Sequence, residues 1–259
     1  MHKIGDLLKN LEKGDKKRNE FCEKHGPYVS RLYLTRTWTH CPVCIEEGYA
    51  RRCSTLDASR RQEAMTRWQE ILGDSGIPSA YQHCTIASFV ANCDKSHRVM
   101  QQIEDYTEDL GATIAAGKNL VMVGWTGTGK THVLSAITMM ALKQNRSAIF
   151  ITASKVFRAI RDTWGRTNTQ TEADVFRALA GVDVLCIDEI QEMDEKERKV
   201  INDVINDRYE KGKPVCVSSN LGKEAFAKHV GARALDRLID RGSTVCIMEW
   251  ESFRSGARW

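Results

Sequence analysis

The chain has 259 residues, of which 42% are hydrophobic and 28% are charged, a composition typical of a folded globular protein. No stretch approaches the roughly 18 consecutive apolar residues of a membrane span, and the first residues lack the apolar core of a signal peptide. We therefore expect a cytoplasmic protein with no membrane partner. A net charge of +4 is too small to indicate nucleic-acid binding by itself. Four of the nine cysteines lie in the first 53 residues, which favours metal binding there over disulfides.

The first 20 residues open with an apolar stripe at helical spacing. It consists of Ile4, Leu7, Leu8 and Leu11. A helix this short is marginal by itself and needs a surface to pack on. Two interpretations stay open: the stripe packs on its own protein, or it docks in a groove on a partner.

Two pairs of potential metal ligands follow the stripe. They are Cys22-x-x-His25 and Cys41-x-x-Cys44, separated by fifteen residues. This spacing predicts a tetrahedral zinc site of the Cys₃His type, with turns supplied by Gly26-Pro27 and Pro42. Cys53 is a spare cysteine that could replace His25 as a ligand. Four protein ligands leave no open position for chemistry, so we expect a structural Zn²⁺ on which the small module depends for its fold.

Three parts are predicted along the chain. Residues 1–53 form the N-terminal helix and zinc module, 54–76 form a polar helical linker, and 77–259 form the main domain. In the main domain, strand patterns alternate with helix patterns. Strands are predicted at 120–123, 147–152, 182–188, 214–219 and 245–249, and helices at 99–110, 131–144, 153–163, 172–180, 196–211 and 225–239. Nearly continuous apolar strands alternating with helices predict an α/β fold with a parallel sheet covered by helices on both faces.

A phosphate-binding loop follows the first of these strands. Its residues are Gly124, Trp125, Thr126, Gly127, Thr128, Gly129, Lys130 and Thr131, which fit G-x-x-x-x-G-K-S/T at every fixed position. The glycines allow a tight turn whose N–H groups converge at the start of a helix, where anions are favoured. We expect Lys130 to reach the β- and γ-phosphates of ATP and the Thr131 hydroxyl to hold Mg²⁺.

Two carboxylates end the strand V-L-C-I-D-E. Asp188 is expected to hold the water shell of Mg²⁺, and Glu189 to polarise the attacking water as a general base. The next strand ends at Asn220, which would lie beside the γ-phosphate and orient water. Arg233, Arg237, Arg241 and Arg254 cluster near the end of the chain, and any one of them is either a cation for the developing charge or a surface charge. For Arg241 we favour the surface charge.

Together these motifs resemble the AAA+ ATPases of the bacterial helicase-loader family, the DnaC type, and the related IstB transposition helpers. The resemblance covers roughly residues 77–256 and rests on the phosphate loop, V-L-C-I-D-E, V-S-S-N, G-A-R-A-L-D-R-L and W-E-S-F-R. The opening M-H-K-I-G-D-L-L-K-N-L resembles the helicase-contacting N-terminus of DnaC proteins. The Cys/His module departs from the best-known enterobacterial loader, although other loaders and phage-borne versions carry a zinc-bearing N-terminus.

The resemblance implies roles for individual residues. Asn220 would be sensor 1, Arg237 the arginine finger with Arg233 as its competitor, and Arg254 sensor 2. The helix at 154–164 falls where the family carries an insertion that contacts single-stranded DNA. Its basic residues would be Lys155, Arg158 and Arg161.

The resemblance implies an ATP-dependent loader that binds a replicative DnaB-type helicase and single-stranded DNA and delivers the helicase at replication origins or forks, with ATP hydrolysis as the release switch. Such a loader would self-associate through its ATP site, and its gene would belong to a host, phage or prophage. Two alternatives stay open. One is an IstB-like ATPase that regulates transposition on duplex DNA. The other is an adaptor that nucleotide binding switches without turnover, which the Asp188-Glu189 pair disfavours.

Overall fold

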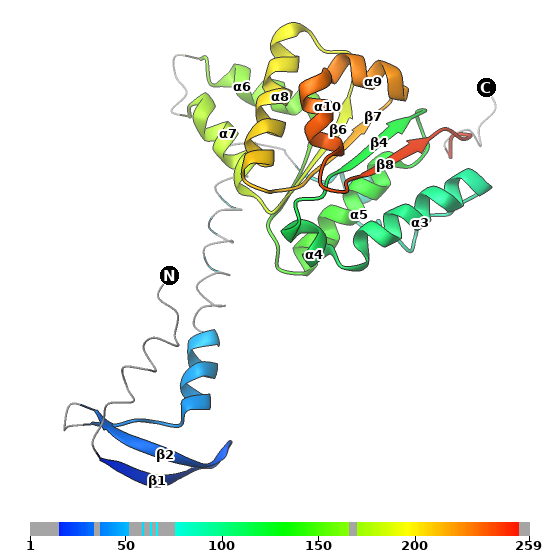
Figure 1. The fold of residues 1–259 in the computed structure, drawn as a ribbon. Coiled ribbons are helices and arrows are strands. Elements are labelled where there is room, and N and C mark those ends of the chain that lie inside the picture. The colour runs from blue at the N-terminus through cyan, green and yellow to red at the C-terminus, as the bar shows by residue number, and fades with distance from the viewer. Residues whose placement is uncertain are drawn as a thin grey trace. The chain divides into compact units, whose positions relative to one another are not determined.

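The computed structural model describes residues 16–33, 37–51, 59, 63, 66, 76–165 and 170–253. The chain divides into two compact units, Met1–Gln62 and Glu63–Trp259 (Figure 1). The apolar stripe at 4–11, Cys53, Arg254 and nearly all of the predicted linker lie outside the described residues. The predicted domain boundaries therefore stay predictions.

The N-terminal unit contains a three-stranded antiparallel sheet. Its strands are β1 (Lys17–Cys22), β2 (Gly26–Tyr33) and β3 (Thr37–Trp38), in the order β1-β2-β3, and residues 42–51 are helical. Side chains of β1 contact both other strands of the sheet. Arg18 lies 4.2 Å from the centre of the Trp38 ring, and the Tyr28 hydroxyl donates to Glu20 at 2.7 Å. Pro42 begins the helix instead of a turn, a position where its missing N–H costs nothing.

The second unit is built on five parallel strands in the order β5-β6-β7-β4-β8. The strands are β4 (Leu120–Gly124), β5 (Ala148–Thr152), β6 (Val184–Ile190), β7 (Val215–Ser219) and β8 (Thr244–Met248). The helices are η1 (Ser79–Tyr81), α3 (Asp94–Glu108), α4 (Leu110–Ala115), α5 (Lys130–Lys143), α6 (Ala153–Asp162), α7 (Glu172–Gly181), α8 (Glu195–Glu210), α9 (Lys223–Val230) and α10 (Ala232–Ile239). None of the helices in the described part of the chain combines the length and apolarity that crossing a bilayer requires.

Helices cover both faces of this sheet, which confirms the predicted fold class (Figure 1). Alternate strand residues point to opposite faces. Val121 and Val123 pack with α6 to α10, whereas Leu120 and Met122 pack with α3 to α5. All four side chains are at most 2% exposed, so the strands are buried on both faces as a parallel sheet requires.

Three elements differ from the sequence-based prediction. The helix predicted at 99–110 begins at Asp94 and ends at Glu108, and a separate helix, α4, follows from Leu110. The single helix predicted at 225–239 is two helices, α9 and α10, because the chain turns at Gly231, which has a φ of 86°. The strand predicted to end at Asp188 continues to Ile190, and its pairing with β7 shifts register between Ile187 and Ile190. This bulge lies in the segment that carries the two predicted acidic residues.

Asn119 ties three elements together immediately before β4. Its Nδ2 donates to the carbonyl oxygens of Arg237 (3.0 Å) and Leu238 (3.2 Å) at the end of α10. Its Oδ1 accepts the N–H of Val215 at 2.8 Å, at the start of β7. The side chain is buried, so these bonds fix the end of α10 to the sheet.

Candidate functional site

The loop between β4 and α5 has three glycines in conformations that other residues rarely adopt. The φ angles are 137° at Gly124, 79° at Gly127 and 97° at Gly129. A Cβ atom on Gly127 would lie 1.9 Å from Ser252 Oγ, and one on Gly129 would lie 2.4 Å from Phe89 Cε2. Segments before and after the loop therefore pack directly on it, and only glycine fits at these two positions.

Lys130 begins α5 and turns its ammonium group back to the loop. Its Nζ donates to the carbonyl oxygens of Gly124 at 2.8 Å and Trp125 at 2.5 Å. Thr128 is buried and donates its hydroxyl to the same Trp125 oxygen at 2.8 Å. These bonds hold a buried positive charge where the backbone N–H groups at the start of α5 converge.

The two predicted carboxylates lie at the end of β6 in different environments. Asp188 is buried and accepts a hydrogen bond from the Ser218 hydroxyl of β7. Glu189 is exposed although it lies between buried residues, because its backbone has a φ of 58° and turns the side chain off the strand. The bulge of β6 thus separates a fixed, buried carboxylate from an exposed one.

One pocket of about 330 Å³ contains most of the predicted nucleotide residues, although Gly124, Trp125 and Thr128 do not line it. It is lined by Thr126, Gly127, Gly129, Lys130, Thr131, Asp188, Glu189 and Asn220 from the sequence-predicted set. The structure therefore brings together a cation, a hydroxyl, two carboxylates and an amide from the ends of three neighbouring strands. Hydroxyl and carboxylate oxygens are hard ligands that suit Mg²⁺, so Thr131 and Asp188 fit that ion.

Aromatic residues that the motif analysis missed form another wall of this pocket. Tyr81, Phe89, His132 and Phe253 line it. The ring of Phe89 lies edge to face with those of His132 and Phe253, each at 5.5 Å between centroids. His132 Nε2–H donates to the Thr85 carbonyl oxygen at 2.9 Å, which fastens α5 to the segment before α3. The available signals were the position of His132 directly after Lys130-Thr131 and of Phe253 within W-E-S-F-R.

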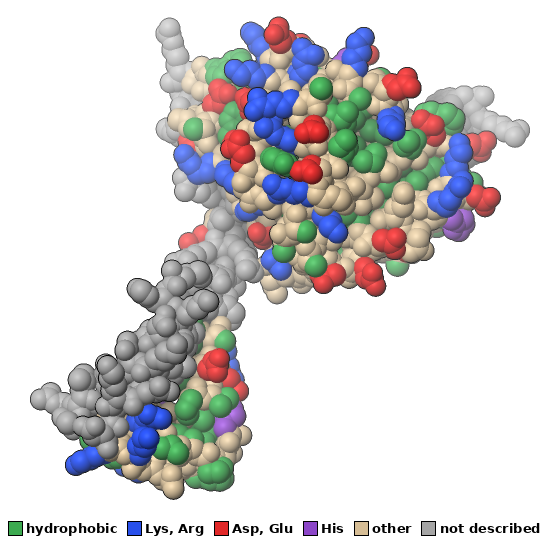
Figure 2. All heavy atoms as spheres, in the orientation of Figure 1, with side chains coloured by type: hydrophobic (Ala, Val, Ile, Leu, Met, Phe, Trp, Pro, Cys, Tyr) green, Lys and Arg blue, Asp and Glu red, His purple; other side chains and the backbone are tan. Residues whose placement is uncertain are grey.

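The candidate finger residues lie outside this pocket. Arg233 and Arg237 are on α10 and line a separate groove of about 660 Å³ between α8 and α10. Figure 2 shows that this face of the unit carries both basic and acidic side chains. The Arg237 guanidinium lies 5.6 Å from the centre of the Tyr209 ring, and Arg241 stacks on the same ring at 4.3 Å. Neither Arg233 nor Arg237 is among the described residues that surround the phosphate loop.

The basic residues predicted to contact DNA lie on α6. Arg158 and Arg161 are exposed and Lys155 is half-buried, while Val156, Phe157 and Ile160 pack the opposite side of the helix into the core. Trp164, just after α6, is 63% exposed. The exposed side of the helix thus carries positive charge, and an exposed aromatic ring follows the helix in the chain.

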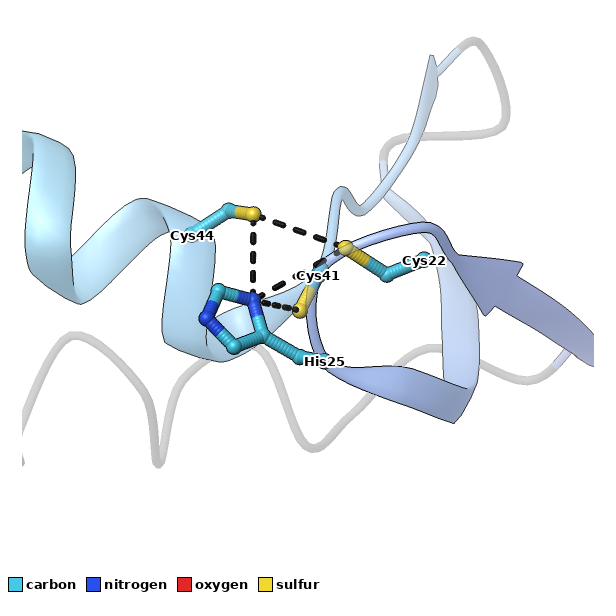
Figure 3. A group of neighbouring side chains, drawn as sticks. All are labelled: Cys22, His25, Cys41 and Cys44. Carbon is cyan, nitrogen blue, oxygen red and sulfur yellow. Dashed lines mark hydrogen bonds between the residues drawn. The ribbon is translucent and has the colours of Figure 1, made fainter.

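The four predicted metal ligands meet in the N-terminal unit (Figure 3). Ligand atoms of Cys22, His25, Cys41 and Cys44 all lie within 4.8 Å of one another. The distances from His25 Nδ1 are 3.8 Å to Cys22 Sγ, 3.6 Å to Cys41 Sγ and 3.3 Å to Cys44 Sγ, and Cys22 Sγ lies 3.6 Å from Cys44 Sγ. A tetrahedral zinc ion with bonds of about 2.3 Å to sulfur and about 2.0 Å to nitrogen separates its ligands by about 3.5–3.8 Å. The cluster therefore fits Zn²⁺.

Glu47 supports the cluster from outside and was not predicted. Its Oε1 lies 3.1 Å from His25 Nε2, which leaves Nδ1 directed at the cysteines. A carboxylate behind a ligating imidazole fixes the ring and the tautomer that binds metal. Glu47 lies one helical turn after Cys44, and this spacing was the available signal.

The cluster also favours a thiolate. The backbone N–H groups of Lys24 and His25 donate to Cys22 Sγ and lower the pKa of this thiol to about 6. The hydrogen bond with Cys22 raises the pKa of the Cys44 thiol to about 11. Thiolates are the form of cysteine that binds metals, so at least one ligand is ready near neutral pH.

Comparison with known proteins agrees with this geometry. The chain is 28% identical to the replicative helicase loader DnaC of Escherichia coli K12 over 257 residues, which cover 98% of this chain and 97% of that protein. A crystal structure of the DnaC helicase loader superposes with a TM-score of 0.57 at 16% identity, over 66% of this chain and 99% of that one. A DnaI structure gives a TM-score of 0.55 at 20% identity, over 68% of this chain and 94% of that one. At these identities the two structures support the fold alone.

The model of the family described as IstB-like ATP binding protein matches residues 88–258. This match begins just before the Phe89 that packs on the phosphate loop and includes every strand of the parallel sheet. The chain therefore carries an IstB/DnaC-type domain and belongs to the family of IstB-like ATP-binding proteins.

Proposed function

We propose that this protein is an ATP-dependent loader that binds a replicative DnaB-type helicase and single-stranded DNA and delivers the helicase at replication origins or forks. The observation that carries the loader role is the extent of the similarity. The match to a protein named as a replicative helicase loader covers 98% of this chain, so it includes the N-terminal unit as well as the nucleotide pocket.

The pocket supports ATP hydrolysis by residues in distinct roles. Lys130 would turn its ammonium from the loop carbonyls to the β- and γ-phosphates, while Thr131 and Asp188 hold Mg²⁺. When bound, the metal neutralises charge on the phosphate oxygens. Glu189, exposed and turned toward the pocket by its backbone, accepts a proton from the attacking water, and the Asn220 amide orients that water. The change from ATP to ADP is then the signal that releases the helicase.

Self-association completes this site in our proposal. Arg237 is half-buried on α10 and borders a groove away from its own phosphate loop, which suits a cation that serves a neighbouring subunit. Arg233 lines the same groove and is the competing candidate. Arg254, in the role of sensor 2, lies outside the described residues.

Single-stranded DNA would lie along the outer side of α6. The charges of Lys155, Arg158 and Arg161 can pair with phosphates, and the exposed ring of Trp164 can stack on a base. Such binding rests on phosphate charge and would weaken steeply as salt is raised.

The N-terminal unit would bind the helicase. In this assignment residues 1–53 are the helicase-binding module, with Zn²⁺ fixing its fold, residues 54–76 are the linker and residues 77–259 are the ATPase domain. The apolar stripe at Ile4, Leu7, Leu8 and Leu11 supplies the docking surface.

The decisive experiment is helicase capture by the full-length protein and by its Leu7→Asp, Leu11→Asp double variant. Each buried leucine contributes about 1.5–3 kcal/mol, so we expect at least about a hundredfold weaker capture with ATP binding and zinc content unchanged. Capture at wild-type strength, together with lower thermal stability or zinc retention, would show that the stripe packs internally. If the wild-type protein does not bind the helicase but binds a transposase on duplex DNA, this result would favour the IstB-like alternative.

A further inference from the structure

A single hydroxyl on β7 contacts both acidic residues at the end of β6. Ser218 and Asp188 are 1% and 3% exposed, and the Ser218 hydroxyl donates to Asp188 Oδ1. The Ser218 hydroxyl oxygen also accepts the backbone N–H of Glu189 at 3.1 Å. That N–H also lies 3.1 Å from Asp188 Oδ1, so the three groups form a closed triangle of hydrogen bonds.

The triangle fixes the orientation of the Asp188 carboxylate and the direction in which the Glu189 side chain leaves the strand, and the proposed ATP hydrolysis depends on both. Both hydrogen bonds to Asp188 use Oδ1, so the carboxylate offers Oδ2 to the pocket that it lines. The bond to the Glu189 N–H holds a backbone with a φ of 58°, a conformation that costs free energy in a residue with a Cβ atom. One side chain thus sets the orientation of one carboxylate and the exit direction of the other.

The bulge explains why a side chain is needed at this point. Pairing between β6 and β7 shifts register between Ile187 and Ile190, so Asp188 and Glu189 lie where the regular ladder is interrupted. The Ser218 hydroxyl forms its hydrogen bonds with Asp188 and Glu189, within this interruption of the ladder. Ser219 bonds beyond it, where its hydroxyl donates to the Ile190 carbonyl oxygen at 2.5 Å and accepts the Leu221 N–H at 3.1 Å.

We propose that Ser218 is a positioning residue for two carboxylates: that of Asp188, which would bind Mg²⁺, and that of Glu189, which would act as the general base. This inference rests on the proposed ATPase function. The Ser218 hydroxyl keeps Asp188 turned toward the metal and Glu189 turned toward the attacking water, without itself contacting the nucleotide.

The test replaces Ser218 by Ala, which removes the oxygen and adds no volume. Loss of a group that supports a metal ligand costs about 10- to 100-fold in affinity or activity. We expect kcat to fall by about that factor with an unchanged KM for ATP. The Mg²⁺ concentration needed for half-maximal binding of a fluorescent ATP analogue should rise, while binding in EDTA stays the same. Ser218→Thr restores the hydroxyl and should recover most of both properties.

Ser219→Ala is the matched control, because it also removes a buried hydroxyl that joins β7 to β6. We expect a comparable loss of thermal stability in both variants, and altered Mg²⁺ dependence in Ser218→Ala alone. Equal changes in the two variants, or Ser218→Ala with wild-type kcat and Mg²⁺ dependence, would overturn the proposal. If the wild-type protein binds ATP but hydrolyses none, the proposed function fails, and the Mg²⁺ dependence of analogue binding still decides the role of Ser218.

Discussion

Asp188 and Glu189 are neighbours in sequence but have opposite exposures, and this difference suits them to the separate roles that we propose. A buried carboxylate held by the Ser218 hydroxyl keeps one orientation, which suits an ion that demands strict octahedral geometry. An exposed carboxylate can approach a water molecule and accept its proton. Lys130, buried between loop carbonyls, would supply the positive charge for the phosphates in the proposed mechanism.

Glu189→Gln should therefore leave ATP affinity intact and lower the hydrolysis rate by about 10²-fold or more, the size of a lost general base. Lys130→Ala should abolish ATP binding itself. Nucleotide titration and phosphate release measure the two effects, and Glu192→Gln, a nearby exposed carboxylate beyond β6, is the control. Hydrolysis at the wild-type rate in Glu189→Gln would remove this residue from the mechanism.

The β1–β2 hairpin and the helical residues 42–51 form an element that has almost no hydrophobic core. Among the side chains described in the N-terminal unit, only Ser30 and Cys41 are buried. A hairpin and one short helix cannot bury enough apolar surface to offset their loss of conformational entropy. A metal ion bound by the Cys/His cluster that joins them would then supply much of the folding free energy.

We therefore expect about one zinc ion per chain, with chelation unfolding the N-terminal unit and leaving ATP binding in place. Cys41→Ser should lose the ion, and Cys53→Ser should retain it. Elemental analysis measures the metal, and proteolysis followed by mass spectrometry locates the unfolded segment. A metal-free protein whose N-terminal unit still resists protease would reduce the ligand spacing to coincidence.

Comparing the sequence-based predictions with the structure shows which features the sequence alone could predict. The phosphate loop, the Asp188-Glu189 pair and the four metal ligands could be located because each is a short motif whose spacing follows from local geometry. The Ser218 hydrogen bonds and the packing of Phe89 on Gly129 could not, because they join segments about 30 and 40 residues apart. The break between α9 and α10 depends on a single glycine conformation that helical periodicity hides.

At the scale of the whole molecule, the positions of Lys130 and Arg237 predict that activity belongs to an assembly. Lys130 lines the nucleotide pocket of its own chain, whereas Arg237 borders a different groove. A chain with an intact nucleotide pocket but no arginine finger should then recover ATP hydrolysis when it is mixed with a chain that has the arginine finger but no functional pocket.

Arg237→Ala should lower hydrolysis by about 10³-fold or more, the contribution of an arginine finger. Mixing it with inactive Lys130→Ala should restore a measurable fraction of the wild-type rate. Arg241→Ala, which removes a neighbouring arginine stacked on Tyr209, is the control and should hydrolyse ATP normally by itself. Failure of the mixture, together with rescue of Arg233→Ala in the same assay, would move the finger role to Arg233.

The amide of Asn119 has a mechanical consequence for such an assembly. Its two ends bind the final carbonyls of α10 and the first N–H of β7, so the helix that carries Arg237 is mounted on the same frame as the strand that leads into the phosphate loop. If exchange of ATP for ADP in one pocket tilted this sheet, α10 would tilt with it. Arg237, which would reach the pocket of the next chain, would then move by a corresponding angle. In a ring or filament of identical chains, the nucleotide bound in one pocket would then affect hydrolysis in the neighbouring pocket, so that the sites would be coupled.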